Sequence, residues 1–372
     1  MGKRKSLAVL ASVDPVLRES TVFNLVMDRP GTVVLRMDFV SGPEGDGIRR
    51  VVLDAGGVVE DVVVPLEHSC LSCATREDAL PTLARLSLDP RWTALVLALP
   101  VSADSFPVCC ALEDATEHGG PLRGLRLTAV MAALSRAGFA ADLLGDDMLA
   151  ERGLALTVDD DRSLGEALAA QVGHADLVLV ADGDVESVGR DDLVSSDLID
   201  HLRGPDSRRV DGLHSFEVAE LFTGRHDAAA AEHRVDPMSA RAVPDAPTDH
   251  GVWSIELRSD RPFHPERLVE LVDRLGQGSF RARGHFWVPS RPDSVCFWDG
   301  AGGQLSVGAM AEWGEEEPRT CLVFTGVGAL QTGLRTAFEQ ILLTPEEFEL
   351  GFHPWLGRDD VLEPWLGART SA

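Results

Sequence analysis

The chain has 372 residues, so it is long enough for two domains that each bury their own hydrophobic core. Its formal net charge is −26, with 60 acidic against 34 basic residues, and a surface of this sign repels phosphate backbones. We therefore expect no direct binding of nucleic acid, and basic proteins are the natural partners of such a surface.

The apolar segments are too short for a membrane span or a signal peptide. No apolar run approaches the ~20 residues that a membrane helix needs. The basic start of the chain is followed by an apolar stretch that already breaks at Ser12 and Asp14. We expect a cytoplasmic protein with no membrane partner, in which the six cysteines are thiols or metal ligands rather than disulfides.

The first half of the chain alternates short strands with helices. Strands are predicted at residues 7–11, 32–39, 51–53, 94–99, 125–130 and 177–181, and helices at residues 20–27, 76–86, 106–117 and 163–171. The last of these helices carries a capping-box pattern, because Ser163 is followed three residues later by Glu166. Short β-branched runs separated by helical segments predict an α/β fold with a mostly parallel sheet.

The connection from the first strand to the first helix has the layout of a phosphate-binding loop without its chemistry. Such a loop needs glycines, so that backbone N–H groups converge on the anion, and a lysine for the outer phosphates. No glycine lies between Ser12 and Arg18. No lysine directly precedes Ser20 and Thr21, and Pro15 removes one N–H donor. The sequence therefore predicts a nucleotide-binding layout with impaired phosphate binding.

Cys70 and Cys73 form a C-x-x-C pair just before a predicted helix. This spacing brings two sulfurs close enough to hold one ion, and the turn before a helix can lower the pKa of both thiols. Zn²⁺ prefers sulfur and nitrogen ligands, so the pair supplies half of a tetrahedral site, and His68 is the nearest further candidate. Other candidates for completing the set are Glu67, Cys109, Cys110 and a water. A redox dithiol and two unrelated cysteines are the alternative interpretations.

Residues 224–250 are predicted to be a linker, with a first domain at residues 1–223 and a second at residues 251–372. The linker is rich in alanine, histidine, proline and aspartate, a composition typical of connecting segments. Its histidines, His226 and His233, are expected to be exposed rather than bound to a metal ion.

The second domain has a different order of elements. It is predicted to contain a strand from Val252, a helix over residues 264–275, three further strand-rich stretches and a helix over residues 331–342. This order predicts a small α+β domain with helices on one face of an antiparallel sheet.

Taken in chain order, these elements and motifs resemble the CobW-like family of metal-chaperone GTPases over nearly the whole chain. The stretch Cys70 to Ala79 is similar to the family's Cys-x-Cys-Cys-Thr-Leu-Arg-x-Asp-Leu motif, with Ser72 in place of the middle cysteine. Several stretches of this chain resemble the family's second domain: RPFHPERL (261–268), RARGHFWVPSRPD (281–293), GAGGQLSVG (300–308), Trp313 and LLTPEEF (342–348). The resemblance implies a degenerate P-loop-GTPase-like domain followed by a small CobW C-terminal domain.

The chain departs from the family at all three nucleotide motifs. The P-loop falls on residues 13–21, where only Ser20 and Thr21 resemble it, and the guanine-reading motif keeps only Asp184. The Walker-B-like motif falls on residues 98–105, where Ala98 replaces the acid. The resemblance thus implies a vestigial nucleotide site at Ser20, Thr21 and Asp184. We expect no GTP hydrolysis and no GTP or Mg²⁺ cofactor, because phosphoryl transfer needs the missing groups.

One branch of this broad family is especially similar. Residues 30–39, 68–80 and 159–180 resemble the actinobacterial Mrf-type proteins, which recruit a ribosome hibernation factor to 70S ribosomes when zinc is scarce. The resemblance implies a non-catalytic, zinc-responsive adaptor in which Cys70 and Cys73 sense zinc, with the hibernation factor and the 70S ribosome as partners. The alternative is a zinc metallochaperone GTPase like the wider family. A third hypothesis treats the cysteines as incidental.

Overall fold

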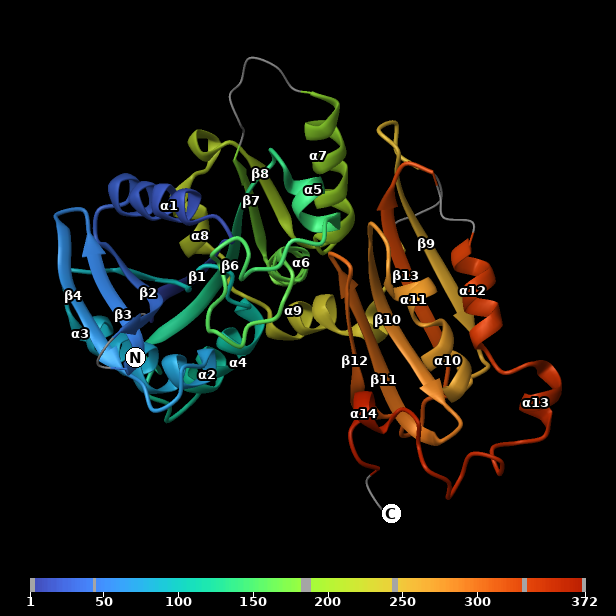
Figure 1. Ribbon diagram of the computed structural model, residues 1–372. Helices are drawn as coiled ribbons and strands as arrows, with labels where there is room; N and C mark the ends of the chain where they lie inside the picture. Colours follow the sequence, from blue (N-terminus) through green and yellow to red (C-terminus); the bar gives the residue numbers. More distant parts are fainter. Residues whose placement is uncertain (1–3, 43–44, 182–188, 243–246, 330–332, 370–372) are drawn as a thin grey trace. The chain divides into compact units, whose positions relative to one another are not determined.

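The computed structural model describes residues 4–42, 45–181, 189–242, 247–329 and 333–369, and these divide into two units (Figure 1). The first unit consists of Met1–Phe139, Asp147–Asp192 and Leu202–Val235. The second unit consists of Ala140–Asp146, Leu193–His201 and Asp236–Ala372.

A mostly parallel sheet forms the centre of the first unit. Among the described residues, its strands follow the order β4-β3-β2-β5-β1-β6-β7-β8. The strands are β1 (Lys5–Ala11), β2 (Thr32–Gly42), β3 (Gly45–Asp54), β4 (Gly57–Pro65), β5 (Ala94–Ala98), β6 (Leu125–Ser135), β7 (Leu177–Ala181) and β8 (Arg208–Asp211). Strands β2 to β4 form an antiparallel meander, and the remaining neighbours pair in parallel. The α/β sheet expected from the sequence is confirmed.

Helices cover both faces of this sheet. The helices of the first unit are α1 (Pro15–Asp28), α2 (Leu71–Cys73), a π-helix (Ala74–Ala79), α3 (Leu80–Leu88), α4 (Ser105–Thr116), α6 (Leu164–His174), α8 (Val218–Thr223) and α9 (Ala228–Val235). Strand β1 is buried on both sides, so its alternate residues divide the core. Leu7 and Val9 pack with residues of α3 and α4, whereas Ala8 and Leu10 pack with residues of α1 and α8. Helices α1 and α4 therefore cover opposite faces.

Several elements differ from the sequence-based expectations. Strands β4 and β8 and helix α7 (Arg190–Leu202) were not predicted. Helix α1 begins at Pro15, five residues before its expected start. Helix α9 lies inside the segment expected to be a linker and packs against α4 and α6 of the first unit. The capping box of α6 is confirmed, since Ser163 and Glu166 each bond the other's backbone N–H.

The second unit contains an antiparallel sheet, as its sequence predicts. In the described part of the chain, the strand order is β12-β11-β10-β13-β9. The strands are β9 (Val252–Ser259), β10 (Phe280–Val288), β11 (Arg291–Ala301), β12 (Gln304–Glu312) and β13 (Thr320–Val327). The helices are α10 (Pro265–Leu271), α11 (Asp273–Gly276), α12 (Gly333–Ile341), α13 (Pro345–Glu349) and α14 (Glu363–Leu366). Most residues of two helices from earlier in the sequence, α5 (Phe139–Leu144) and α7, also belong to this unit. The expected start of the last predicted helix, residues 331–332, lies outside the described residues.

Aromatic side chains build the core of the second unit. Phe263, Phe286, Trp298 and Phe338 are fully buried and make edge or tilted ring contacts with one another. Across the described residues, every helix falls short of the length and apolar character that a bilayer crossing demands.

Candidate metal centre

The two cysteines of the C-x-x-C pair lie at the start of α2, in the connection from β4 to α3. Cys70 is the N-cap residue with extended backbone, and its Sγ accepts a hydrogen bond of 3.4 Å from the backbone N–H of Cys73. Cys70 is exposed and Cys73 is buried. The pair therefore offers one sulfur to an incoming ligand and holds the other against the protein.

The thiol of Cys73 is harder to ionise than the sequence suggests. A hydrogen bond shared with the Cys70 side chain raises the pKa of Cys73, and burial raises it further. The guanidinium of Arg76, 3.7 Å from the Cys73 Sγ, lowers it by a smaller amount. The expectation that helix geometry lowers the pKa of both thiols is wrong for Cys73, because the shared hydrogen bond favours its protonated form.

The described residues supply two of the four ligands that a tetrahedral zinc site needs. Across residues 4–369, outside the gaps given above, no group of three or more His, Cys, Asp or Glu side chains is arranged to hold a metal ion. His68 is exposed, and its backbone carbonyl accepts a bond from the N–H of Cys70, but its side chain is not gathered with the two thiols into such a group. Cys109 is buried in the core of the first unit, as core packing predicts.

The segment after the cysteines is a π-helix, Ala74–Ala79, between α2 and α3. π-Helical turns are rare and occur frequently at functional sites. The buried carboxylate of Asp78 anchors this turn, because it pairs with Arg50 of β3, which also pairs with Glu60 of β4 at 2.5 Å. The cysteine pair thus stands on a segment that ion pairs fix to the antiparallel edge of the sheet.

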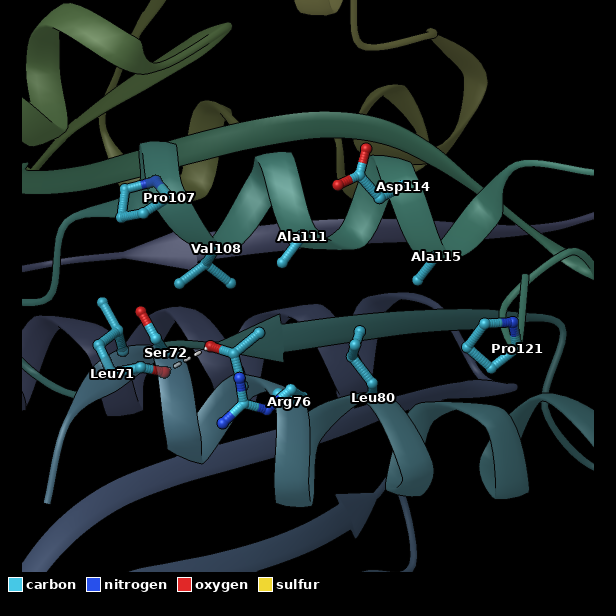
Figure 2. Close-up of a pocket in the computed structure, with 11 residues that line it drawn as sticks. Leu71, Ser72, Arg76, Leu80, Pro107, Val108, Ala111, Asp114, Ala115 and Pro121 are labelled. Atoms are coloured by element: carbon cyan, nitrogen blue, oxygen red, sulfur yellow. Dashed lines mark hydrogen bonds between the residues drawn. The ribbon is translucent and has the colours of Figure 1, made fainter. Parts of the chain in front are cut away.

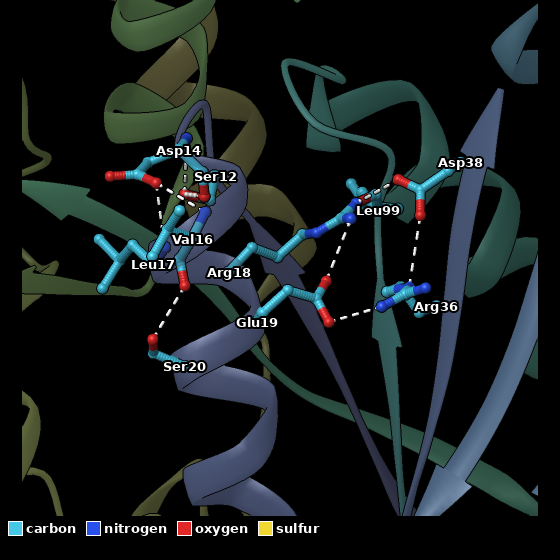
Figure 3. Close-up of polar contacts among 10 residues, drawn as sticks. All are labelled: Ser12, Asp14, Val16, Leu17, Arg18, Glu19, Ser20, Arg36, Asp38 and Leu99. Atoms are coloured by element: carbon cyan, nitrogen blue, oxygen red, sulfur yellow. Dashed lines mark hydrogen bonds and ion pairs between the residues drawn. The ribbon is translucent and has the colours of Figure 1, made fainter. Parts of the chain in front are cut away.

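The start of α1, where a phosphate-binding loop would present its N–H groups, is capped from within the chain. The Asp14 carboxylate accepts hydrogen bonds from the N–H groups of Val16 and Leu17, at 2.8 and 3.0 Å (Figure 3). Pro15 has no N–H to offer. Helix N-termini bind anions through free N–H groups, and here a carboxylate already takes two of them.

Ion pairs fix the first turn of α1 to the sheet (Figure 3). The buried Arg18 donates to Asp38 at 2.7 Å and to the carbonyl of Leu99 at 2.9 Å. Arg36 pairs with Glu19 at 2.5 Å and with Asp38 at 3.3 Å. This network joins α1 to β2 and to the end of β5, the position at which a nucleotide site is expected.

The residues predicted for the vestigial nucleotide site do not assemble in the described part of the chain. The Ser20 hydroxyl donates to the carbonyl of Val16 at 2.9 Å, within its own helix. Thr21 is fully buried, and its hydroxyl has no hydrogen-bond partner among the described residues. Asp184 lies outside the described residues. Their role in nucleotide binding stays a prediction.

Sequence reasoning missed a buried polar cluster under α9. The Nδ1 atom of His226 lies 2.7 Å from a carboxylate oxygen of Asp176, whose other oxygen accepts a bond from Arg234 at 2.7 Å. His174 shares a hydrogen bond of 2.8 Å with Ser105, and burial lowers the pKa of His174 to about 3. The expectation that His226 is exposed is wrong, since only 5% of it is accessible. The cluster attaches α9 to the first unit.

The fold and the site define an α/β protein with a P-loop-like layout, a pair of cysteines of which Cys70 is exposed, and a separate antiparallel domain. Residues 252–342 match the family described as "Cobalamin synthesis protein cobW C-terminal domain". This match lies within the antiparallel sheet and helices of the second unit, so the chain is similar to the CobW family over this part. The link to the Mrf-type branch stays a prediction.

Two curated relatives cover much of the chain. The Mycobacterium tuberculosis protein named zinc chaperone Rv0106 is 28% identical over 307 residues, which are 78% of this chain and 70% of that protein. Zinc-regulated GTPase metalloprotein activator 1 of Dictyostelium discoideum is 24% identical over 265 residues, 68% of this chain and 55% of that protein. Among solved structures, the Zn(II)-bound YjiA GTPase from E. coli is 14% identical with a TM-score of 0.37, over 92% of this chain and 99% of that chain.

Proposed function

We propose that this protein binds zinc through the thiolates of Cys70 and Cys73 and passes it on or responds to it as a CobW-type protein. The proposal rests on the arrangement of the two cysteines. Cys70 is exposed, and its Sγ atom accepts a hydrogen bond from the backbone N–H of Cys73. Thiolates at this spacing fit Zn²⁺, which takes tetrahedral sulfur and nitrogen ligands. The names of the two curated relatives, a zinc chaperone and a zinc-regulated activator, also support a zinc-related role.

The chain's own residues prepare the site for the ion. Cys70 is the entry ligand because it is exposed, and Cys73 is held beside it by the helix start. Both thiols give up a proton when zinc binds, because only the thiolate is a metal ligand. Arg76 lies close enough to Cys73 to stabilise that negative charge.

We further propose that zinc handling here needs no GTP cycle. The self-capped start of α1 supports this, because Asp14 already accepts bonds from N–H groups that a phosphate would need. The absent glycines and lysine remove the remaining positioning and charge neutralisation. A zinc metallochaperone GTPase is the second candidate, favoured by the word GTPase in the name of the Dictyostelium relative.

The partners remain a separate proposal. We propose a basic protein partner, because the chain carries a net charge of −26. The resemblance to Mrf-type proteins makes a ribosome hibernation factor on the 70S ribosome the specific expectation. Zinc would control such an adaptor by binding one conformation more tightly than another. Co-sedimentation with ribosomes from zinc-starved and zinc-replete cells tests it, and equal absence from both ribosome fractions would contradict it.

Zinc analysis of purified variants tests the proposed function. Replacing Cys70 and Cys73 by serine should remove bound zinc while circular dichroism stays unchanged. Cys110→Ser is the matched control, because Cys110 is also exposed and lies on another helix. Zinc content that is equal in the double variant and the control would refute the proposal. GTP hydrolysis by the purified wild type would instead favour the metallochaperone GTPase.

A further inference from the structure

We propose that two copies of this chain share one zinc ion, held in a tetrahedral site by Cys70 and Cys73 of each copy. This inference rests on the proposed function, because it takes the cysteine pair to be the zinc ligand. It adds the source of the missing ligands and the identity of the partner at the site.

The ligand count points to a second, identical half-site. The described residues bring two thiols together and no third His, Cys, Asp or Glu side chain to join them. Zinc sites with four cysteine ligands are closed and tetrahedral, and C-x-x-C pairs supply two ligands each. A two-fold axis through the ion would supply the same pair twice, and closed two-fold symmetry is the commonest arrangement of homo-oligomers. Cys70 is exposed, so the second copy can reach it.

Arg76 supplies positive charge beside the shared ion. One Zn²⁺ with four thiolates carries a net charge of −2, and its formation displaces four thiol protons into solvent. The guanidinium of Arg76 lies 3.7 Å from the Cys73 Sγ, so two copies supply two positive charges at the ion. Arg76 also pairs with Glu77 at 3.3 Å, so this carboxylate offsets part of its positive charge. The guanidinium of each copy therefore offsets only part of the negative charge of the four thiolates.

An apolar groove flanks the pair and provides a contact surface. The groove has a volume of about 440 Å³ and lies between α2 with the π-helix and α4 (Figure 2). Its walls include Leu71, which stands between the two cysteines in the sequence, and Leu80, Val108 and Ala111. Metal ligands alone give a small interface, and apolar area beside them strengthens a two-fold contact. The second copy would cover this area on both sides of the axis.

Sedimentation analysis with zinc as the only added ligand tests the shared site. The wild-type chain should form a dimer when one zinc ion is added per two chains and return to a monomer when a chelator removes it. Cobalt substitution should give the strong charge-transfer absorption of four thiolates rather than two. One zinc ion per chain in a stable monomer would overturn the shared site and leave the proposed function standing. Zinc binding that survives Cys70→Ser would overturn both.

A groove variant separates the contact surface from the ligands. Ala111→Glu places a charge in the groove and keeps every thiol, so it should weaken the zinc-linked dimer by about tenfold or more. Ala229→Glu is the matched control, since Ala229 is an exposed alanine on helix α9 of the same unit. Arg76→Ala should weaken the dimer and Arg76→Lys should restore part of it. Equal zinc-linked dimerisation of Ala111→Glu and Ala229→Glu would contradict the role of the groove.

Discussion

The backbone N–H of Cys73 donates a hydrogen bond to the Sγ atom of Cys70 across 3.4 Å. This bond fixes the Cys70 side chain at the start of α2, and the Cys73 thiol shares a further hydrogen bond with it. Ligands that are already arranged lose less conformational entropy on binding. We infer that zinc meets a formed half-site rather than two independent thiols.

Zinc binding is expected to release the protons of both thiols, because only thiolates bind the ion. The zinc affinity of each pair should therefore rise by about a hundredfold per pH unit while both thiols are protonated in the free protein. Calorimetric titrations in two buffers with different ionisation enthalpies count the released protons. Zinc binding without proton release near neutral pH would exclude Cys70 and Cys73 as the ligands.

Removing Arg50 is expected to destabilise the segment that carries the cysteines. Arg50→Ala leaves the buried carboxylate of Asp78 without its partner, which costs about 3–5 kcal/mol. Arg85→Ala is the control, because Arg85 makes an exposed pair with Glu60 and should cost no more than about 1 kcal/mol. Urea unfolding measures both. Equal losses of unfolding free energy in the two variants would show that Asp78 does not depend on Arg50.

The buried imidazole of His174 predicts a loss of stability in acid. Burial lowers the pKa of His174 from 6.5 to about 3, so the folded chain keeps it neutral. Its contribution is fully present above pH 6.5 and is lost as the pH falls towards 3, because the unfolded chain then binds a proton that the folded chain does not. Between pH 6.5 and pH 5 the loss is about 2 kcal/mol.

Urea unfolding at the two pH values measures this loss in the wild type and in His174→Gln. The variant has no imidazole to protonate at this position, so its unfolding free energy should fall less with acidification. A fall of the same size in both proteins would assign the acid sensitivity to other groups.

The cap of α1 gives a prediction about both stability and nucleotide binding. Asp14→Ala removes the acceptor for two backbone N–H groups and should cost about 1 kcal/mol, whereas Asp14→Asn should keep most of the cap. Neither variant should gain appreciable affinity for a fluorescent GTP analogue, because Pro15 and the missing lysine remain. Urea unfolding and fluorescence anisotropy measure the two effects. Micromolar binding of the analogue by the wild type or by either variant would show that the start of α1 still binds phosphate.

The parts of the fold that the sequence predicted are those with local signals. Strands β1, β5 and β7 are short apolar runs buried on both faces, and such runs are distinct in the sequence. Strand β4 was missed because it is an edge strand whose exposed valines, Val58 and Val63 among them, surround two acidic residues and follow no alternation of buried and exposed positions.

Only the part of the candidate site that depends on residues close in sequence could be predicted. The separation of Cys70 and Cys73 predicts their closeness, whereas the absence of a third ligand depends on contacts between distant segments in the described chain. The burial of His226 was likewise out of reach, because its partner Asp176 lies 50 residues earlier. The direction of the Cys73 pKa shift was missed since it depends on the shared hydrogen bond with Cys70.

The zinc affinity of the full chain, measured by competition with a chromophoric chelator with and without GTP and Mg²⁺, shows whether the protein binds zinc without a nucleotide cycle. If the cysteine pair binds zinc and the start of α1 is already capped by Asp14, the affinity should be the same under both conditions and should be lost in Cys70→Ser. A zinc affinity that rises about tenfold or more when GTP and Mg²⁺ are added would instead show that a working nucleotide site controls zinc binding.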